Sequence, residues 1–232
     1  MKKLTSSKRL YPENIFVSPG LAIKRMIGLR QKHGDTKALT DGKFKREREM
    51  WIAGVFLLAM ARITRKEYWL RTVEEAPTPD IITINLSPTA NGSLAEFQNV
   101  EIFEYESHFQ GDMVDAIRSK LSKKSYPDNY ALLCYFHGRT GEVLKPHEIS
   151  NEISKLSPKL SQIWIMGSIR SENPHTYTVT QLFPERIYHN FDYKAALNET
   201  SQKELIRARR DLTKKTLSVD FEDLGKVLLP LP

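Results

Sequence analysis

The spacing of apolar residues indicates a long, buried helix in the first third of the chain. Thr40 or Asp41 could cap its start, and the helical pattern then continues without interruption to about Lys66. Its middle, MWIAGVFLLAMA, is apolar on almost every side, so the helix is expected to pack against other elements on more than one side. A shorter amphipathic helix is predicted after the Pro-Gly pair at residues 19–20.

Strand-like and helical segments alternate after the long helix. The pattern predicts strands over 68–73, 80–86 and 99–105, a helix over 111–124, a buried strand over 130–137, a helix over 147–157 and a second buried strand over 161–169. This order predicts an α/β fold in which helices flank a mixed, partly parallel sheet. Residues 175–183 then alternate like an added strand, and residues 198–215 have the composition of a polar, basic helix.

The same pattern divides the chain into three parts. Residues 1–42 are predicted to form a basic N-terminal arm, residues 43–169 the α/β core, and residues 170–232 a C-terminal extension. Hydrophobic residues make up 40% of the 232 and charged residues 27%. These proportions are ordinary for a globular protein that buries a substantial core.

Other bulk properties indicate a cytoplasmic protein without a membrane partner. The only cysteine, Cys134, excludes an intrachain disulfide and suits a reducing compartment. The longest apolar run, Met50 to Ala61, is too short to cross a bilayer core of about 30 Å. The basic N-terminal residues are not followed by the apolar segment of a signal peptide, so none is expected.

Positive charge is concentrated near the N-terminus. Residues 1–50 carry 13 lysines and arginines and 5 acids, a balance of +8, whereas the whole chain carries +7. Such a basic segment is typical of contact with nucleic-acid phosphates, and Lys24, Arg25, Arg30 and Lys32 are the candidate contacts. The alternative is a solvated extension without a ligand.

Two acids occupy the predicted strands that follow the long helix. Asp80 comes directly after Pro79 at the start of the second strand, and Glu101 lies among apolar neighbours within the third. An unpaired carboxylate inside a sheet is costly, so Glu101 is expected to have a partner or a ligand. Glu47 begins the long helix and could join such a site, with Glu49 as the alternative. The alternatives are a turn residue at Asp80 and an exposed strand face at Glu101.

Together, this order of elements and these acids resemble the PD-(D/E)XK nuclease-like family, also called restriction-endonuclease-like. The resemblance covers about residues 43–169 and implies an α-β-β-β-α-β core. It also implies that Asp80 and Glu101 bind Mg²⁺ or Mn²⁺ and that Glu47 assists them. The chemistry agrees, because carboxylates hold such hard cations and the ion can activate water for phosphodiester hydrolysis.

The sequence departs from the family where a lysine is expected two residues after Glu101. This chain has Phe103 there. The charge could instead come from the next helix, in which Lys120 is the predicted replacement, with Lys123, Lys124 and Arg118 as alternatives. The predicted catalytic residues are therefore Asp80, Glu101 and Lys120.

The functional prediction is metal-dependent cleavage of nucleic acid, with DNA favoured over RNA. The first alternative is an inactive protein of the same fold that binds nucleic acid or serves as an assembly module, as Phe103 would favour. The second is a protein-interaction domain whose arm contacts an acidic partner or a second copy of the chain.

Overall fold

A computed structural model describes the protein over residues 15–73, 79–89, 92–105, 111–136, 144–168 and 175–200, and the backbone of three further strands within 204–230. It divides into two compact units. Unit 1 contains Met1–Phe97 and Glu199–Pro232, and unit 2 contains Gln98–Asn198. Helices accompany parallel and antiparallel strands, so the chain is an α/β protein with a mixed sheet, as predicted. Among the described residues, no helix is long and apolar enough to span a membrane.

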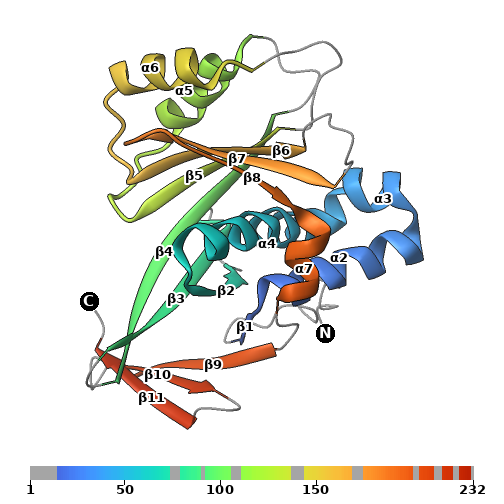
Figure 1. Ribbon diagram of the computed structural model, residues 1–232, viewed down its shortest axis with the longest axis vertical. Helices are drawn as coiled ribbons and strands as arrows, with labels where there is room; N and C mark the ends of the chain where they lie inside the picture. Colours follow the sequence, from blue (N-terminus) through green and yellow to red (C-terminus); the bar gives the residue numbers. More distant parts are fainter. Residues whose placement is uncertain are drawn as a thin grey trace, which may run out of the picture. The chain divides into compact units, whose positions relative to one another are not determined.

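Antiparallel pairing joins the strands of unit 1 (Figure 1). Their order is β11-β10-β9-β1-β2-β3. The bounds are β1 Ile15–Val17, β2 Glu67–Thr72, β3 Ile81–Thr89, β9 Glu204–Asp211, β10 Thr216–Phe221 and β11 Gly225–Pro230. The first part of β4, Gly92–Tyr105, follows β3 in this order.

The helices of unit 1 are α2 (Pro19–His33), α3 (Asp35–Thr40), a short 3-10 helix at Gly42–Phe44, and α4 (Lys45–Thr64). The predicted cap Asp41 accepts a hydrogen bond from the Lys43 amide, so it begins the 3-10 helix that leads into α4. Arg65, with φ of 57°, ends α4 in the left-handed conformation. Helix α4 is buried over most of its length, as its apolar sequence predicts.

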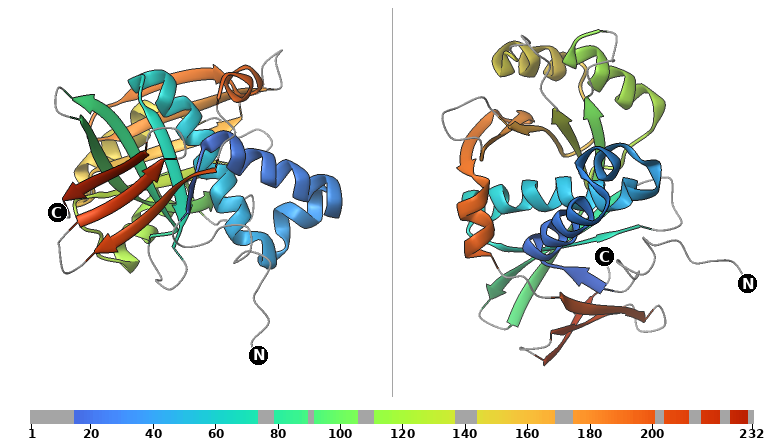
Figure 2. Two further views of the ribbon diagram at one scale, coloured as in Figure 1. Left: turned by 90° about the horizontal axis from the view of Figure 1, so that it is seen from below. Right: turned by 90° about the vertical axis from the view of Figure 1, so that its right-hand side faces the viewer.

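Residues 15–40 are an integral part of unit 1, which corrects the prediction of an N-terminal arm for this stretch. The Ser18 hydroxyl caps α2 by accepting a hydrogen bond from the Leu21 amide. Ala22, Ile23 and Met26 are completely buried, and α2 packs against α4 (Figure 2). A Cβ atom at Gly54 of α4 would lie 3.1 Å from the Pro19 carbonyl oxygen, so glycine permits this close approach. Residues 1–14 of the predicted arm lie outside the described part of the chain.

In unit 2, the second part of β4 pairs in parallel with β5 (Tyr130–Phe136), which pairs in parallel with β6 (Gln162–Ser168). Antiparallel pairing then adds β7 (Thr176–Phe183) and β8 (Ile187–Asp192). Helices α5 (Met113–Lys123) and α6 (Pro146–Lys155) lie side by side on one face of these strands (Figures 1 and 2). Helix α7 (Tyr193–Glu199) follows β8.

The core of unit 2 lies between its strands and the helices α5 and α6. Ile117 of α5 and Ile153 of α6 are completely buried there, together with Leu132, Cys134 and Ile163 of the strands. The apolar stripes predicted for both helices therefore face the sheet, as amphipathic helices require.

The predicted strands and helices over 68–169 are confirmed, with two strands longer than expected, since β3 runs to Thr89 and β4 begins at Gly92. The added strand predicted over 175–183 is β7. The helix predicted over 198–215 is wrong, because β9 occupies 204–211 and pairs with β1 and β10. Ladder hydrogen bonds to these strands outweigh the helical preference of its charged residues.

Candidate functional site

Glu101 is a buried carboxylate on β4 of unit 2, with only 1% of its surface exposed. It lies opposite Leu132 of β5 in the parallel register. Side chains alternate along a strand, so Glu101 shares its face with Phe103 and Tyr105. Tyr105 belongs to the core beneath α5 and α6, so this face of β4 looks toward the helical layer.

Two lysines of the α5 end hold this carboxylate. The Nζ atoms of Lys120 and Lys124 lie 2.9 Å and 2.7 Å from the same oxygen, Oε1 of Glu101. The other oxygen, Oε2, is buried and has no hydrogen-bond partner in the described structure. Two ammonium groups against one carboxylate leave this cluster with a net positive charge. Lys120, the predicted replacement for the strand lysine, thus contacts Glu101, and Lys124 makes an equivalent contact.

Phe103 lies two residues after Glu101 on the same strand face, at the position where the predicted resemblance expects a lysine. Its side chain is half-buried and packs against the core of unit 2. Of the other predicted substitutes, Lys123 is exposed and Arg118 forms an ion pair with Asp115 at 2.5 Å. Positive charge therefore reaches Glu101 from Lys120, in the last turn of α5, and from Lys124, the extended residue that directly follows the helix.

Lys124 is also one of the residues that line an open pocket of about 490 Å³. It lies between the end of α5 and the segment that follows α6, with Arg118 and Lys159 among its lining residues. The hydroxyl-bearing residues Ser122, Ser125, Tyr126 and Ser157 also line it. We call this the basic pocket. Cationic and hydroxyl groups together are suited to hydrogen-bond phosphate oxygens.

Sequence reasoning did not single out Lys159 or the loop that carries it. The available signal was a similarity between two helix ends, because α5 ends within SKKSY (122–126) and α6 ends within SKLSPK (154–159). Both segments combine lysine with serine. Their meeting at one pocket depends on the packing of α5 beside α6, which neither segment reveals alone.

Glu47 is a second buried carboxylate, in the first turn of α4 in unit 1. It is completely buried, and neither carboxylate oxygen has a hydrogen-bond partner in the described structure. Burial raises the pKa of Glu47, because the low-dielectric interior disfavours the charged form. Glu49 instead forms an ion pair with Lys45 at 3.2 Å. Of the two acids, Glu47 is thus the one whose carboxylate has no hydrogen-bond partner in the described structure.

Asp80 is half-buried and precedes β3 in unit 1, where its backbone carbonyl accepts a hydrogen bond from Val73. Glu47 belongs to the same unit, whereas Glu101 belongs to unit 2. Within the described residues, no three or more His, Cys, Asp or Glu side chains are grouped so that they could hold a metal ion. Binding of Mg²⁺ or Mn²⁺ by Asp80, Glu101 and Glu47 therefore stays a prediction.

The predicted nucleic-acid contacts Lys24, Arg25, Arg30 and Lys32 are all on α2. Lys24 and Lys32 are exposed, and Arg25 is half-buried. Arg30 donates hydrogen bonds of 2.8 Å and 2.9 Å to the two carboxylate oxygens of Asp35, and this contact lowers the pKa of Asp35. The charge of Arg30 is thus already compensated, so Lys24 and Lys32 are the more available contacts.

Comparison with known proteins finds no matching family model, no matching curated protein and no matching solved structure. Fold and geometry therefore define the class: an α/β protein with a lysine-bound carboxylate beside a basic pocket.

Replacing Glu47 by glutamine is expected to stabilise the protein by about 1–3 kcal/mol at pH 8, because an unpartnered buried carboxylate is costly. The sign follows from the raised pKa. The folded state keeps its proton to a higher pH than the unfolded state, so wild type loses stability as pH rises from the unfolded pKa through the folded pKa. Urea denaturation at pH 4.5 and pH 8 should show a gain for Glu47→Gln only at the higher pH.

Glu49→Gln serves as the matched control, since it removes a paired acid two residues away. An equal difference between wild type and Glu47→Gln at both pH values would contradict the expectation. The same variants test the metal prediction. If Glu47 is a ligand, MgCl₂ should stabilise wild type and leave Glu47→Gln unchanged.

Proposed function

We propose that the protein binds nucleic acid through the phosphate backbone, using the basic pocket of a nuclease-like α/β core, with DNA as the expected polymer. The observation that carries this proposal is the pairing of Glu101 with both Lys120 and Lys124, beside a pocket that Lys124 and Lys159 line. Arg118, which is paired with Asp115, also lines it. Lysine and arginine side chains neutralise backbone phosphates and release their counterions. This mode of binding requires no metal ion.

The pairing also supports a binding role over a catalytic one. Mg²⁺ requires near-ideal octahedral coordination by oxygen atoms, of which carboxylates usually supply one or two. Oε1 of Glu101 already contacts two ammonium groups. A cation that bound this oxygen would have to displace them, or it would be repelled by them at short distance. Phe103 also supports a binding role, because it leaves the strand without the lysine of the nuclease-like family.

Metal-dependent phosphodiester hydrolysis is the second candidate, and one observation favours it. Oε2 of Glu101 is buried without a partner, so this oxygen could accept a ligand. Bound Mg²⁺ or Mn²⁺ would supply Lewis-acid activation of water. Glu101 would hold the ion through this oxygen, and Lys120 would stabilise negative charge that develops on the phosphate.

The binding proposal predicts a specific weakening in the double variant Arg118→Ala/Lys159→Ala. Fluorescence anisotropy with labelled duplex DNA should show affinity reduced by about ten-fold at 100 mM salt. The slope of log affinity against log salt should become shallower by about one for each phosphate that is no longer neutralised. Lys123→Ala is the matched control, since this exposed lysine of α5 is not among the residues that line the pocket. Equal reductions in both variants would refute the pocket as the binding surface.

Cleavage assays separate the two candidates. Wild type, Asp80→Ala and Glu101→Gln are incubated with single- and double-stranded DNA and RNA in the presence of Mg²⁺ or Mn²⁺. Cleavage by wild type that is abolished in both variants would establish hydrolysis. Salt-sensitive binding without cleavage would support the binding proposal. A protein that neither binds nor cleaves would refute both and leave the role of a protein-interaction module.

A further inference from the structure

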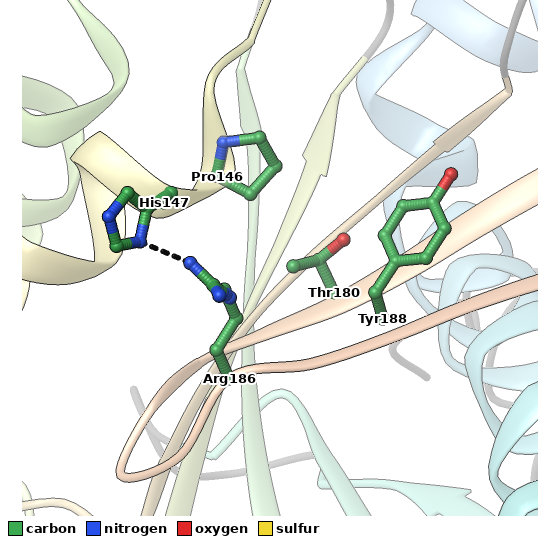
Figure 3. Close-up of a pocket in the computed structure, with 5 residues that line it drawn as sticks. All are labelled: Pro146, His147, Thr180, Arg186 and Tyr188. Atoms are coloured by element: carbon green, nitrogen blue, oxygen red, sulfur yellow. Dashed lines mark hydrogen bonds between the residues drawn. The ribbon is translucent and has the colours of Figure 1, made fainter.

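A second pocket lies in unit 2 at the other end of α6. It has a volume of about 450 Å³ and is lined by Pro146, His147, Thr180, Arg186 and Tyr188 (Figure 3). Pro146 and His147 begin α6, whereas the basic pocket lies at residues that follow this helix. Ten residues of α-helix span about 15 Å, so the two pockets are separate sites.

The floor of this pocket is the β7–β8 hairpin. Thr180 and Tyr188 face each other across the two strands, so their side chains lie on the same face of the sheet. Leu182, two residues along β7, is completely buried in the core on that face. Helix α6 is tied to this point by a hydrogen bond of 2.7 Å from the Ser150 hydroxyl to the Leu182 carbonyl. Thr180 and Tyr188 therefore lie just beyond the edge of the helical layer.

Thr180 contributes a hydroxyl group to the floor of the pocket. Thr180 is only 3% exposed, yet it lines the pocket. Its hydroxyl forms no hydrogen bond with any residue that the structure describes. The hydroxyl oxygen is not itself sealed from solvent, so it is accessible in the pocket and can donate a hydrogen bond to a ligand there.

Arg186 and His147 form a pair of nitrogen donors at one side of the pocket. The Arg186 guanidinium donates to Nδ1 of His147, as the dashed line in Figure 3 marks. A guanidinium cannot accept a hydrogen bond, so Nδ1 is the acceptor and the Nε2 nitrogen of a neutral His147 carries hydrogen. Neither side chain forms an ion pair with an acid among the described residues. The neighbouring acid Glu148 is paired instead with Lys145 at 2.9 Å.

The start of α6 adds to this positive environment. Because the helix begins at Pro146, its first amide hydrogens are those of His147 and Glu148, which the helix itself does not use. The positive end of the helix dipole favours an anion at this position. The unpartnered Thr180 hydroxyl is the independent sign of a ligand here.

Tyr188 adds an exposed aromatic ring to the lining of the pocket. Its side chain is 59% exposed, the largest value among the exposed large hydrophobic residues of the described structure. In Figure 3 the ring lies on the opposite side of Thr180 from His147 and Arg186. An exposed aromatic ring can stack on a nucleobase, and such stacking does not depend on the identity of the base.

We propose that this pocket binds a phosphorylated nucleoside. Arg186, His147 and Thr180 hold the phosphate, and the base stacks on Tyr188. The side-by-side arrangement of anion donors and an exposed aromatic ring fits this ligand better than inorganic phosphate, which would leave Tyr188 without a role. The nucleoside could be free or at the phosphorylated end of a strand. This site requires neither a metal ion nor the basic pocket.

The test uses isothermal titration calorimetry of the full-length protein with AMP, adenosine and inorganic phosphate. AMP should bind more tightly than either of its parts. Arg186→Gln should weaken AMP binding by roughly 10- to 100-fold, because it removes charge-assisted hydrogen bonds. Tyr188→Ala should weaken AMP by roughly 5- to 100-fold and leave inorganic phosphate unchanged. Thr180→Val, which retains shape and folding, should also weaken AMP.

Matched controls isolate the site. Lys194→Gln removes an exposed positive charge elsewhere in unit 2, and Ile187→Ala removes an exposed apolar side chain from the opposite face of β8. Both should bind AMP like wild type. No binding of AMP, or binding that Arg186→Gln, Tyr188→Ala and Thr180→Val leave intact, would overturn the proposal. Adenosine that binds as tightly as AMP would do the same.

Two oligonucleotides distinguish the source of the nucleotide. If the site takes a strand end, a 5′-phosphorylated oligo(dA) should bind more tightly than its 5′-hydroxyl form, and Tyr188→Ala should remove the difference. If the site takes a free nucleotide, AMP alone should show the dependence on Tyr188. Arg118→Ala/Lys159→Ala should retain AMP binding in either case, so failure of the basic pocket would be recognised separately.

Discussion

Lys120→Met/Lys124→Met is expected to lower the free energy of unfolding by about 3 kcal/mol at neutral pH. Glu101 is only 1% exposed, and both lysines contact the same carboxylate oxygen. Removing both would leave a buried carboxylate without any compensating charge. Each single substitution should cost much less, because the remaining ammonium group still pairs with Oε1. Urea denaturation of the four proteins would measure this non-additivity.

A third substitution tests the cause. Adding Glu101→Met to the double variant removes the unpaired buried carboxylate. It should restore most of the stability, since an apolar cluster of similar volume can replace a buried ion pair. Lys123→Met is the control for removal of a lysine from the same helix. A double variant as stable as wild type, or one that Glu101→Met does not rescue, would mean that these two lysines do not hold Glu101.

Gly167→Ala is expected to destabilise the protein by about 3 kcal/mol through overpacking. Gly167 pairs with Phe136 across the parallel strands β5 and β6. A Cβ atom at Gly167 would lie 2.7 Å from the backbone oxygen of Phe136 and 3.3 Å from its Cβ atom. The first atom belongs to the backbone of a neighbouring strand, so relief would require the strands to separate. Thermal denaturation should show a clearly lowered Tm.

Gly28→Ala is the matched control and should have the opposite effect. Gly28 is exposed in the interior of α2, and no atom lies within 4 Å of the position its Cβ would take. Alanine should stabilise this helix by about 1 kcal/mol, because glycine has more conformational freedom to lose on folding. Equal effects of the two substitutions on Tm would show that the close approach of the strands at Gly167 does not determine the stability of Gly167→Ala.

The local pattern of the sequence was sufficient for most elements of unit 2. Helix α5 shows why: Met113, Val114 and Ile117 recur at helical spacing, and all three are buried against the sheet. The apolar run at 130–137 likewise forms β5, a strand buried over nearly its whole length. Periodicity of this kind is read from neighbouring residues, so the sequence alone can reveal it.

Local pattern failed where a distant segment decided the structure. The charged stretch around residues 204–211 is helical in composition, yet it forms β9 because β1 at residues 15–17 provides a strand to pair with. By pattern alone, β1 and the helix after it belong to an arm, because an apolar stripe does not reveal which element covers it. In the structure, Ala22, Ile23 and Met26 are buried and their helix packs on α4.

For the candidate site, the sequence by itself identified Glu101 as an acid in an apolar strand and the next helix as a source of lysines. Only the tertiary structure decided which lysines reach it, because helix position and side-chain length leave Lys120, Lys123 and Lys124 equivalent until α5 is packed on the sheet. Arg186 and His147 are likewise 39 residues apart and meet only when β8 and α6 assemble. Local periodicity thus determines which elements form, and contacts between distant segments decide which functional groups meet.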